Sequence, residues 1–191
     1  IIRDRNRELS ELETYDTGAI EVTQQDRQLR SGSVIRNNLV VDTVGYYSDG
    51  VKDVYLSWGI YLDSFAGGYE VTHNISVRNS HGGIMLQGGK DNRIVNNIFV
   101  DSSLRQMTIS NFSDNSTGQV VQQNIFYYSD PQAHLLRGGR LAPEVVRVDR
   151  NVYYCPGLET PAVAVRGIDS FEKWREAGFD ADSVWADPRF V

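Results

Sequence analysis

Four acidic side chains in the first half of this 191-residue chain have the type and spacing for acid–base chemistry. Asp16 precedes the segment Gly18-Ala-Ile-Glu-Val22, which contains Glu21, and Asp63 closes the segment Gly59-Ile-Tyr-Leu-Asp63. Asp91 stands in Gly88-Gly-Lys-Asp-Asn92. A pair of carboxylates suits glycoside hydrolysis, in which one protonates the leaving oxygen and the other acts as base or nucleophile. The alternative is a turn role, because Asp before Thr-Gly and Asp-Asn after Gly-Gly are common turn sequences.

Five further side chains are candidates for contacting a substrate near these acids. Tyr61 and Trp58 have rings that can stack on sugars, although Trp58 can equally be buried at a corner of the fold. His81 is either a general base or a turn histidine bonded to backbone. Gln87 and Lys90 follow on the next glycine-led segment and complete the predicted substrate-binding set.

A repeat along the chain indicates the elements that hold these residues. Each copy reads apolar, any two residues, Asn, apolar, any residue, apolar. The Asn positions step by 36 (38 to 74), 23 (74 to 97), 27 (97 to 124) and 27 (124 to 151) residues. A repeat of this length is typical of solenoids, propellers or arrays. The repeated residues are Asn38, Asn74, Asn97, Asn124 and Asn151.

The repeat predicts an all-β protein, a right-handed parallel β-helix. Alternating apolar residues after each Asn indicate a strand with one buried face, and Asn suits the bend before it because it tolerates left-handed backbone angles. Stacked Asn side chains would form a hydrogen-bonded ladder. Glycine-led apolar segments supply a second strand in each coil. Leucine-rich repeats lack support because their Leu signature is missing, and a β-sandwich would show hairpin turns.

Strand alternation predicts which side chains face outward. If Ile60 and Leu62 point into the core, then Glu21, Tyr61 and Met85 form one outer column. The next outer column holds Thr23, Asp63, Gln87 and Ser110. With coils about 4.8 Å apart and alternate residues about 6.7 Å apart, the backbones of Glu21 and Asp63 are roughly 8 Å apart.

Composition limits the partners. The net charge is −6 without a Lys/Arg cluster, which argues against nucleic acid and anionic membranes, and no apolar run approaches the length of a membrane span. A polyanionic polysaccharide would need a local row of basic side chains (a basic track), which the overall negative charge of the chain would conceal. Cys155 is expected to be a buried or half-buried thiol, and no sequence cluster predicts a metal site.

The pattern divides the chain into two parts. Residues 1–166 are predicted to form coils, with an incomplete first coil and an insertion at about 44–57, and residues 167–191 to form a helix and an extended tail packed on the solenoid. The helix is predicted between Asp169 as N-cap, with Glu172 three residues on, and Gly178 as the stop. The chain opens without Met in a polar stretch and closes on Trp185-Ala-Asp-Pro-Arg-Phe-Val191 without an evident cap, so we expect it to be a piece of a longer β-helix with an N-terminal remainder.

The sequence resembles bacterial right-handed parallel β-helix (pectate-lyase-like) proteins of carbohydrate metabolism. It is most similar to the β-helix glycosidases that include fucosidase and xylanase activities. The resemblance implies the C-terminal portion of a longer, secreted or periplasmic protein that acts on a poly- or oligosaccharide. By motif, Asp16 and Asp63 are the preferred acid pair, followed by Asp91 and Glu21. Ser64 is a departure, since many relatives carry a second Asp there. The segments that carry the likeness are Asp16-Thr-Gly-Ala-Ile20, Gly59-Ile-Tyr-Leu-Asp63, Gly88-Gly-Lys-Asp-Asn92 and Asp187-Pro-Arg-Phe-Val191.

Three functions remain open at this point. A glycoside hydrolase needs no cofactor, and its carboxyl separation distinguishes retention, at about 5–5.5 Å, from inversion, at about 6.5–9.5 Å. A uronate lyase or epimerase would use a base and a charge neutraliser, for which His81, Tyr61, Lys90 and Arg93 are available, with calcium as a possible cofactor. A non-catalytic carbohydrate-binding or structural solenoid would need no paired acids.

Overall fold

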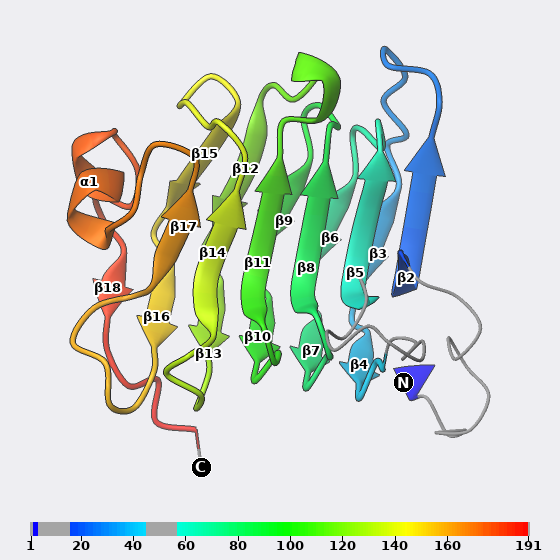
Figure 1. The fold of residues 1–191 in the computed structure, drawn as a ribbon. Helices are drawn as coiled ribbons and strands as arrows, with labels where there is room; N and C mark the ends of the chain where they lie inside the picture. Colours follow the sequence, from blue (N-terminus) through cyan, green and yellow to red (C-terminus); the bar gives the residue numbers. More distant parts are fainter. Residues whose placement is uncertain (1, 4–15, 45–56, 191) are drawn as a thin grey trace, which may run out of the picture.

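The computed structural model describes residues 2–3, 16–44 and 57–190. Within them the chain forms a parallel β-solenoid of about four turns, which confirms the predicted fold class. The predicted insertion at about 44–57 and the incomplete first coil lie mostly outside the described residues. In Figure 1 the chain ascends at the front, descends behind and advances to the left, which makes the coil right-handed.

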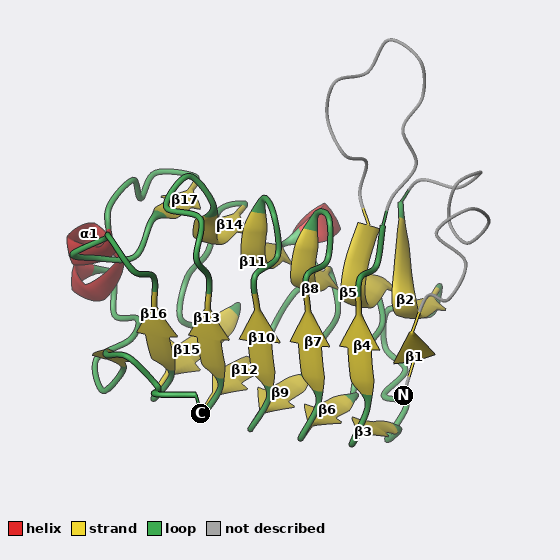
Figure 2. Ribbon diagram, turned by 90° about the horizontal axis from the view of Figure 1, so that it is seen from below, coloured by secondary structure: helices red, strands yellow, loops and turns green. Residues whose placement is uncertain are grey.

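Three parallel sheets line the solenoid, and each full coil gives one strand to each sheet (Figures 1 and 2). We name them the front, back and bottom sheets after their positions in Figure 1. The front sheet comprises β2 (Thr17–Gln24), β5 (Ser57–Ser64), β8 (Gly82–Gln87), β11 (Arg105–Ser110), β14 (His134–Gly138) and β17 (Val163–Val165). The back sheet comprises β3 (Val34–Arg36), β6 (Glu70–Thr72), β9 (Arg93–Val95), β12 (Gln119–Gln122) and β15 (Val146–Asp149). The bottom sheet comprises β1 (Ile2–Arg3), β4 (Leu39–Val41), β7 (Ile75–Val77), β10 (Ile98–Val100), β13 (Ile125–Tyr127), β16 (Val152–Tyr154) and β18 (Val184–Trp185).

The predicted Asn ladder occupies the turn between the back and bottom sheets. From Asn74 onward, each Oδ1 accepts from the backbone N of the preceding ladder residue at 2.9–3.0 Å and from its Nδ2 at 3.0–3.1 Å. The sharp bend is made one residue earlier than predicted. The ladder residues keep ordinary φ angles, and the residues before them take φ of 54–58°: Asn37, His73, Asn96, Gln123 and Arg150. The ladder Asn therefore satisfies the buried backbone of the turn instead of supplying its left-handed residue.

The interior is filled by inward side chains that stack from coil to coil. On the bottom sheet, Phe99 stacks on Phe126 with ring centroids 4.9 Å apart, and Phe126 contacts Tyr153 at 5.6 Å. On the front sheet, Ile60 and Leu62 are buried as alternation predicted, and their register partners Ile84 and Leu86 continue the core. This repeated stacking makes the solenoid a rigid support for its outer face.

The front strands carry two consecutive inward positions, which alternation did not predict. A Cβ added at Gly59 would meet the Ser76 hydroxyl, and a Cβ added at Gly83 would lie 2.9 Å from the Phe99 ring. Both glycines therefore face the interior, as do Ile60 and Ile84, which directly follow them. Two columns of outward side chains flank these consecutive inward positions, one before them and one after them along each strand. One holds Trp58, Gly82, Arg105 and His134, and the other holds Glu21, Tyr61, Met85, Thr108 and Arg137.

The C-terminal residues close the solenoid. Helix α1 (Phe171–Glu176) takes its N-cap from Ser170, whose side chain accepts from the Lys173 backbone N at 3.2 Å, instead of from the predicted Asp169. Beyond α1 the chain re-enters the coil, and β18 pairs with β16 in the bottom sheet. Ser183 takes the next position of the ladder, because its hydroxyl accepts from the Asn151 backbone N at 2.9 Å. In the described part of the chain, no helix has the length and apolarity to span a membrane.

Candidate functional site

Asp16 and Tyr61 meet on the outer face of the front sheet. Asp16 immediately precedes β2, is exposed and has φ of 63°. Tyr61 lies in β5, one coil later, and its hydroxyl donates to Asp16 Oδ1 at 3.0 Å. The same hydroxyl lies 3.0 Å from Oε1 of Gln87, at the end of β8. Register between neighbouring strands thus gathers residues from three coils around one phenol.

Asp63 joins this group from the end of β5. Its carboxylate accepts from the Ser64 backbone N at 2.6 Å and from the Ser64 hydroxyl at 3.1 Å, which holds it at the strand end. Burial raises the pKa of Tyr61 strongly, and the charges and hydrogen bonds of Asp16 and Asp63 raise it further. The phenol therefore stays neutral, and it donates its proton to Asp16.

Glu21 lies on the same face in register with Tyr61. It is exposed, and its Oε2 turns back to accept from the Gly18 backbone N at 3.0 Å. The strand register agrees with the outer columns that alternation predicted. One column contains Glu21, Tyr61 and Met85, and the other contains Thr23 and Asp63. Of the four predicted acids, the structure brings Asp16 and Asp63 together around Tyr61 and leaves Glu21 beside them.

Trp58 and Tyr61 are covered instead of presenting open ring faces. Together with Met85 they form an apolar cluster outside the main core, with exposed fractions of 2%, 2% and 7%. Trp58 lies over Gly82, where an added Cβ would come within 2.3 Å of its ring, and His81 packs on it with centroids 4.5 Å apart. Stacking of a sugar on either ring is therefore not available in this structure, and Tyr61 contributes through its hydroxyl.

Asp91 and Lys90 lie in the turn between β8 and β9 and belong to a different group. Asp91 forms an ion pair with Arg30, whose Nε is 2.5 Å from Asp91 Oδ2, and its backbone N donates to the carbonyl of Thr117 at 2.9 Å. Lys90 pairs through its backbone with Thr117. These contacts hold the turn, and the structure does not bring either residue to the Tyr61 phenol.

Comparison with known proteins adds no further assignment. A scan against family models finds no match, and neither the curated proteins nor the solved structures contain one. The fold and the geometry of the outer face therefore carry the functional argument.

A group of cationic side chains on the same face was missed by the sequence reasoning. Arg105 of β11 is in register with His134 of β14, and Arg137 is in register with Thr108. Burial and then the charge of Arg137 lower the pKa of Arg105 to about 10. Burial, followed by the charges of both arginines, lowers the pKa of His134. These residues lie 3 to 32 positions apart in the sequence, so only the register of the coils could have revealed the group.

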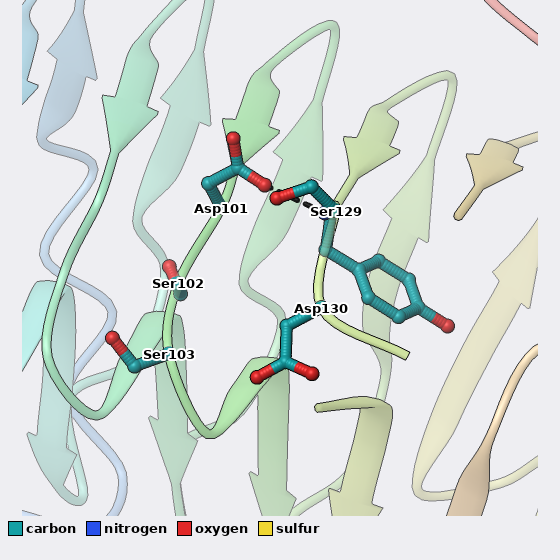
Figure 3. A pocket seen from close by; sticks show the side chains of 6 residues that line it. Asp101, Ser102, Ser103, Ser129 and Asp130 are labelled. Carbon is teal, nitrogen blue, oxygen red and sulfur yellow. Dashed lines mark hydrogen bonds between the residues drawn. The ribbon is translucent and has the colours of Figure 1, made fainter. Parts of the chain in front are cut away.

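A hollow of about 150 Å³ lies elsewhere, at the turn from the bottom sheet to the front sheet (Figure 3). Its carboxylates bond to backbone: Asp101 Oδ1 accepts from the Ser129 backbone N of the next coil at 2.7 Å, and Asp130 Oδ1 accepts from the Gln132 backbone N of its own turn at 2.8 Å. Ligand pockets usually enclose about 300–1,000 Å³. Within the described residues, no group of three or more His, Cys, Asp or Glu side chains is arranged to hold a metal ion.

Proposed function

We propose that this chain is a carbohydrate-active β-helix protein, a glycoside hydrolase that acts on a complex polysaccharide with Asp16 and Asp63 as its carboxylate pair. One observation carries the proposal: two carboxylates from neighbouring coils flank one buried, neutral phenol on a rigid outer face. In this role one carboxyl group protonates the leaving oxygen, and the other acts as nucleophile or base. The resemblance to secreted β-helix glycosidases extends the proposal to a secreted or periplasmic location.

The test is hydrolysis of a panel of neutral and acidic plant and algal glycans, followed through new reducing ends. We expect Asp63→Asn and Asp16→Asn to remove activity while the circular dichroism spectrum and melting temperature stay close to those of the parent. Asp91→Asn is the matched control, because it removes a carboxylate from an ion pair in a separate turn. An Asp63→Asn variant that keeps the parent's full rate would overturn the proposal.

Lyase or epimerase action on uronates is the second candidate, favoured by the guanidinium groups of Arg105 and Arg137 beside the His134 imidazole. A lyase forms an unsaturated sugar with its own ultraviolet absorbance and consumes no water, so the same panel distinguishes the two reactions. Binding of a glycan without any turnover would instead indicate a non-catalytic solenoid.

A further inference from the structure

The cationic group lies on a part of the outer face that the acid pair does not use. Arg105 is half-buried at the start of β11, and His134 and Arg137 are exposed at either end of the bend in β14. The two arginines affect the titration of their neighbours, since Arg137 lowers the pKa of Arg105 and both arginines lower the pKa of His134. The outer face between the two columns therefore concentrates positive charge in a chain whose net charge is −6.

The positive charge has no acidic partner within the described residues. None of the ion pairs there includes Arg105, His134 or Arg137. Withdrawing a guanidinium from water beside a second one is unfavourable unless an anion compensates it. Guanidinium groups bind carboxylates and sulfates well, because their planar N–H groups match two oxygens at once.

Thr108 supplies an independent observation at the same place. It lies in β11 in the outward column, between Met85 on one side and Arg137 on the other. Its exposed fraction is 9%, and its hydroxyl has no hydrogen-bond partner within the described structure. Buried polar groups are nearly always hydrogen-bonded, so the unpaired Thr108 hydroxyl, in register with Arg137, is a donor available to an anion.

The position of this group relates it to the acid pair. Tyr61 and Arg137 belong to one outward column and are separated by three strand steps, from β5 through β8 and β11 to β14. At about 4.8 Å per step, the backbones are about 14 Å apart along the solenoid axis. That span is longer than one sugar ring, so a ligand reaching both places must be an oligosaccharide laid along the axis.

We propose that Arg105, Thr108 and Arg137, with His134 at the rim, form a subsite for an anionic group, a carboxylate or a sulfate ester, of an acidic glycan that runs along the front sheet. This subsite assigns the substrate class and rests on the proposed hydrolase function for the glycan's orientation. It is the local basic track that the overall negative charge conceals.

The test is isothermal titration calorimetry of the chain with three oligosaccharides of matched length. An oligogalacturonate presents carboxylates, a sulfated galactan oligosaccharide presents sulfate esters, and a xylo-oligosaccharide is the neutral control. We expect at least one acidic probe to bind about tenfold more tightly than the neutral one, with an affinity that falls as salt is added. The preferred acidic probe identifies the anion.

Three variants and a matched control complete the test. Arg137→Gln and Arg105→Gln should each weaken acidic-probe binding about tenfold or more, and Thr108→Val should weaken it to a smaller extent. Arg147→Gln, which removes an exposed charge from β15 on the back sheet of the same coil, should leave binding unchanged. Equal binding of neutral and acidic probes, or unaltered binding by both arginine variants, overturns the subsite.

The same measurements separate this proposal from the hydrolase assignment. Asp63→Asn should bind the acidic probe at least as tightly as the parent, because it removes a negative charge without touching the cationic group. Anion-dependent binding without hydrolysis by the parent would refute the hydrolase function and leave the subsite standing. Hydrolysis that depends on Asp63 but ignores Arg105 and Arg137 would refute the subsite alone.

Discussion

The Asn ladder makes a quantitative prediction for Asn97→Ala. The Asn97 side chain accepts from the backbone N and Nδ2 of Asn74, both at 3.0 Å, and donates to the carbonyl of Val71 at 2.8 Å and to Asn124 Oδ1 at 3.0 Å. After truncation, Asn124 Oδ1 still accepts from the Asn97 backbone and Asn74 Nδ2 still donates to Ile35, but the buried Asn74 N–H loses its partner. An orphaned buried donor costs about 1–3 kcal/mol, which sets the expected loss of unfolding free energy.

Urea denaturation and thermal melting measure this loss. At roughly 2–4 °C per kcal/mol for a chain of this size, the melting temperature should fall by roughly 2–12 °C. Asn38→Ala is the matched control, because Asn38 is half-buried and water can replace part of what is removed, so its effect should be smaller. An Asn97→Ala variant as stable as the parent, or an Asn38→Ala variant equally destabilised, would refute the ladder reasoning.

Three further changes test other parts of the structure. Tyr61→Phe should lower kcat/KM on a cleaved glycan by about 10- to 100-fold, since a hydrogen bond to a charged group contributes roughly 1.5–3 kcal/mol; an unchanged kcat/KM would contradict the role of its hydroxyl. Burial raises the pKa of Asp180, so its contribution to stability is complete below the unfolded value of about 3.9 and is lost as pH rises through the folded value. The stability of Asp180→Asn relative to the parent should accordingly improve as pH rises above about 4 in urea titrations, and a constant difference would contradict this. Gly89→Ala should destabilise by about 3 kcal/mol or more, because the new Cβ would meet the Ala66 carbonyl, whereas Gly139→Ala has room and serves as the control; equal melting temperatures would argue against the close approach.

The fold was predictable because the same pattern of Asn and apolar residues recurs in successive coils. The step from Asn74 to Asn97 to Asn124 fixes the coil phase, and apolar residues at fixed offsets fix the inward face. The C-terminal coil was harder to predict, because its last strand pairs as in earlier coils although its sequence lacks the repeated Asn. Ser183 replaces the ladder Asn, and the buried Asp180, whose backbone N donates to the Val148 carbonyl, accepts on its carboxylate from Ser183, Tyr153 and Trp174.

The site was predictable only in part. Coil phase places Glu21 beside Tyr61 and Thr23 beside Asp63, so the pairing of residues 40 positions apart follows from the sequence. The covering of Trp58 does not follow, because it depends on the space that Gly82 leaves one strand away. The assumption that side chains alternate strictly also fails at Gly59, which faces inward next to the inward Ile60. The sequence does not distinguish such a strand from a regularly alternating strand that contains a glycine.

The most direct test of the account measures hydrolysis by Asp16→Asn, Asp63→Asn and the double variant on one glycan that the parent cleaves. Groups that act as a unit in a reaction have non-additive effects on its rate. We expect each single variant to lose at least about a thousandfold in kcat and the double variant to be no slower than the worse single variant. Two small losses that multiply in the double variant, or full activity in either single variant, would contradict a catalytic pair at Asp16 and Asp63.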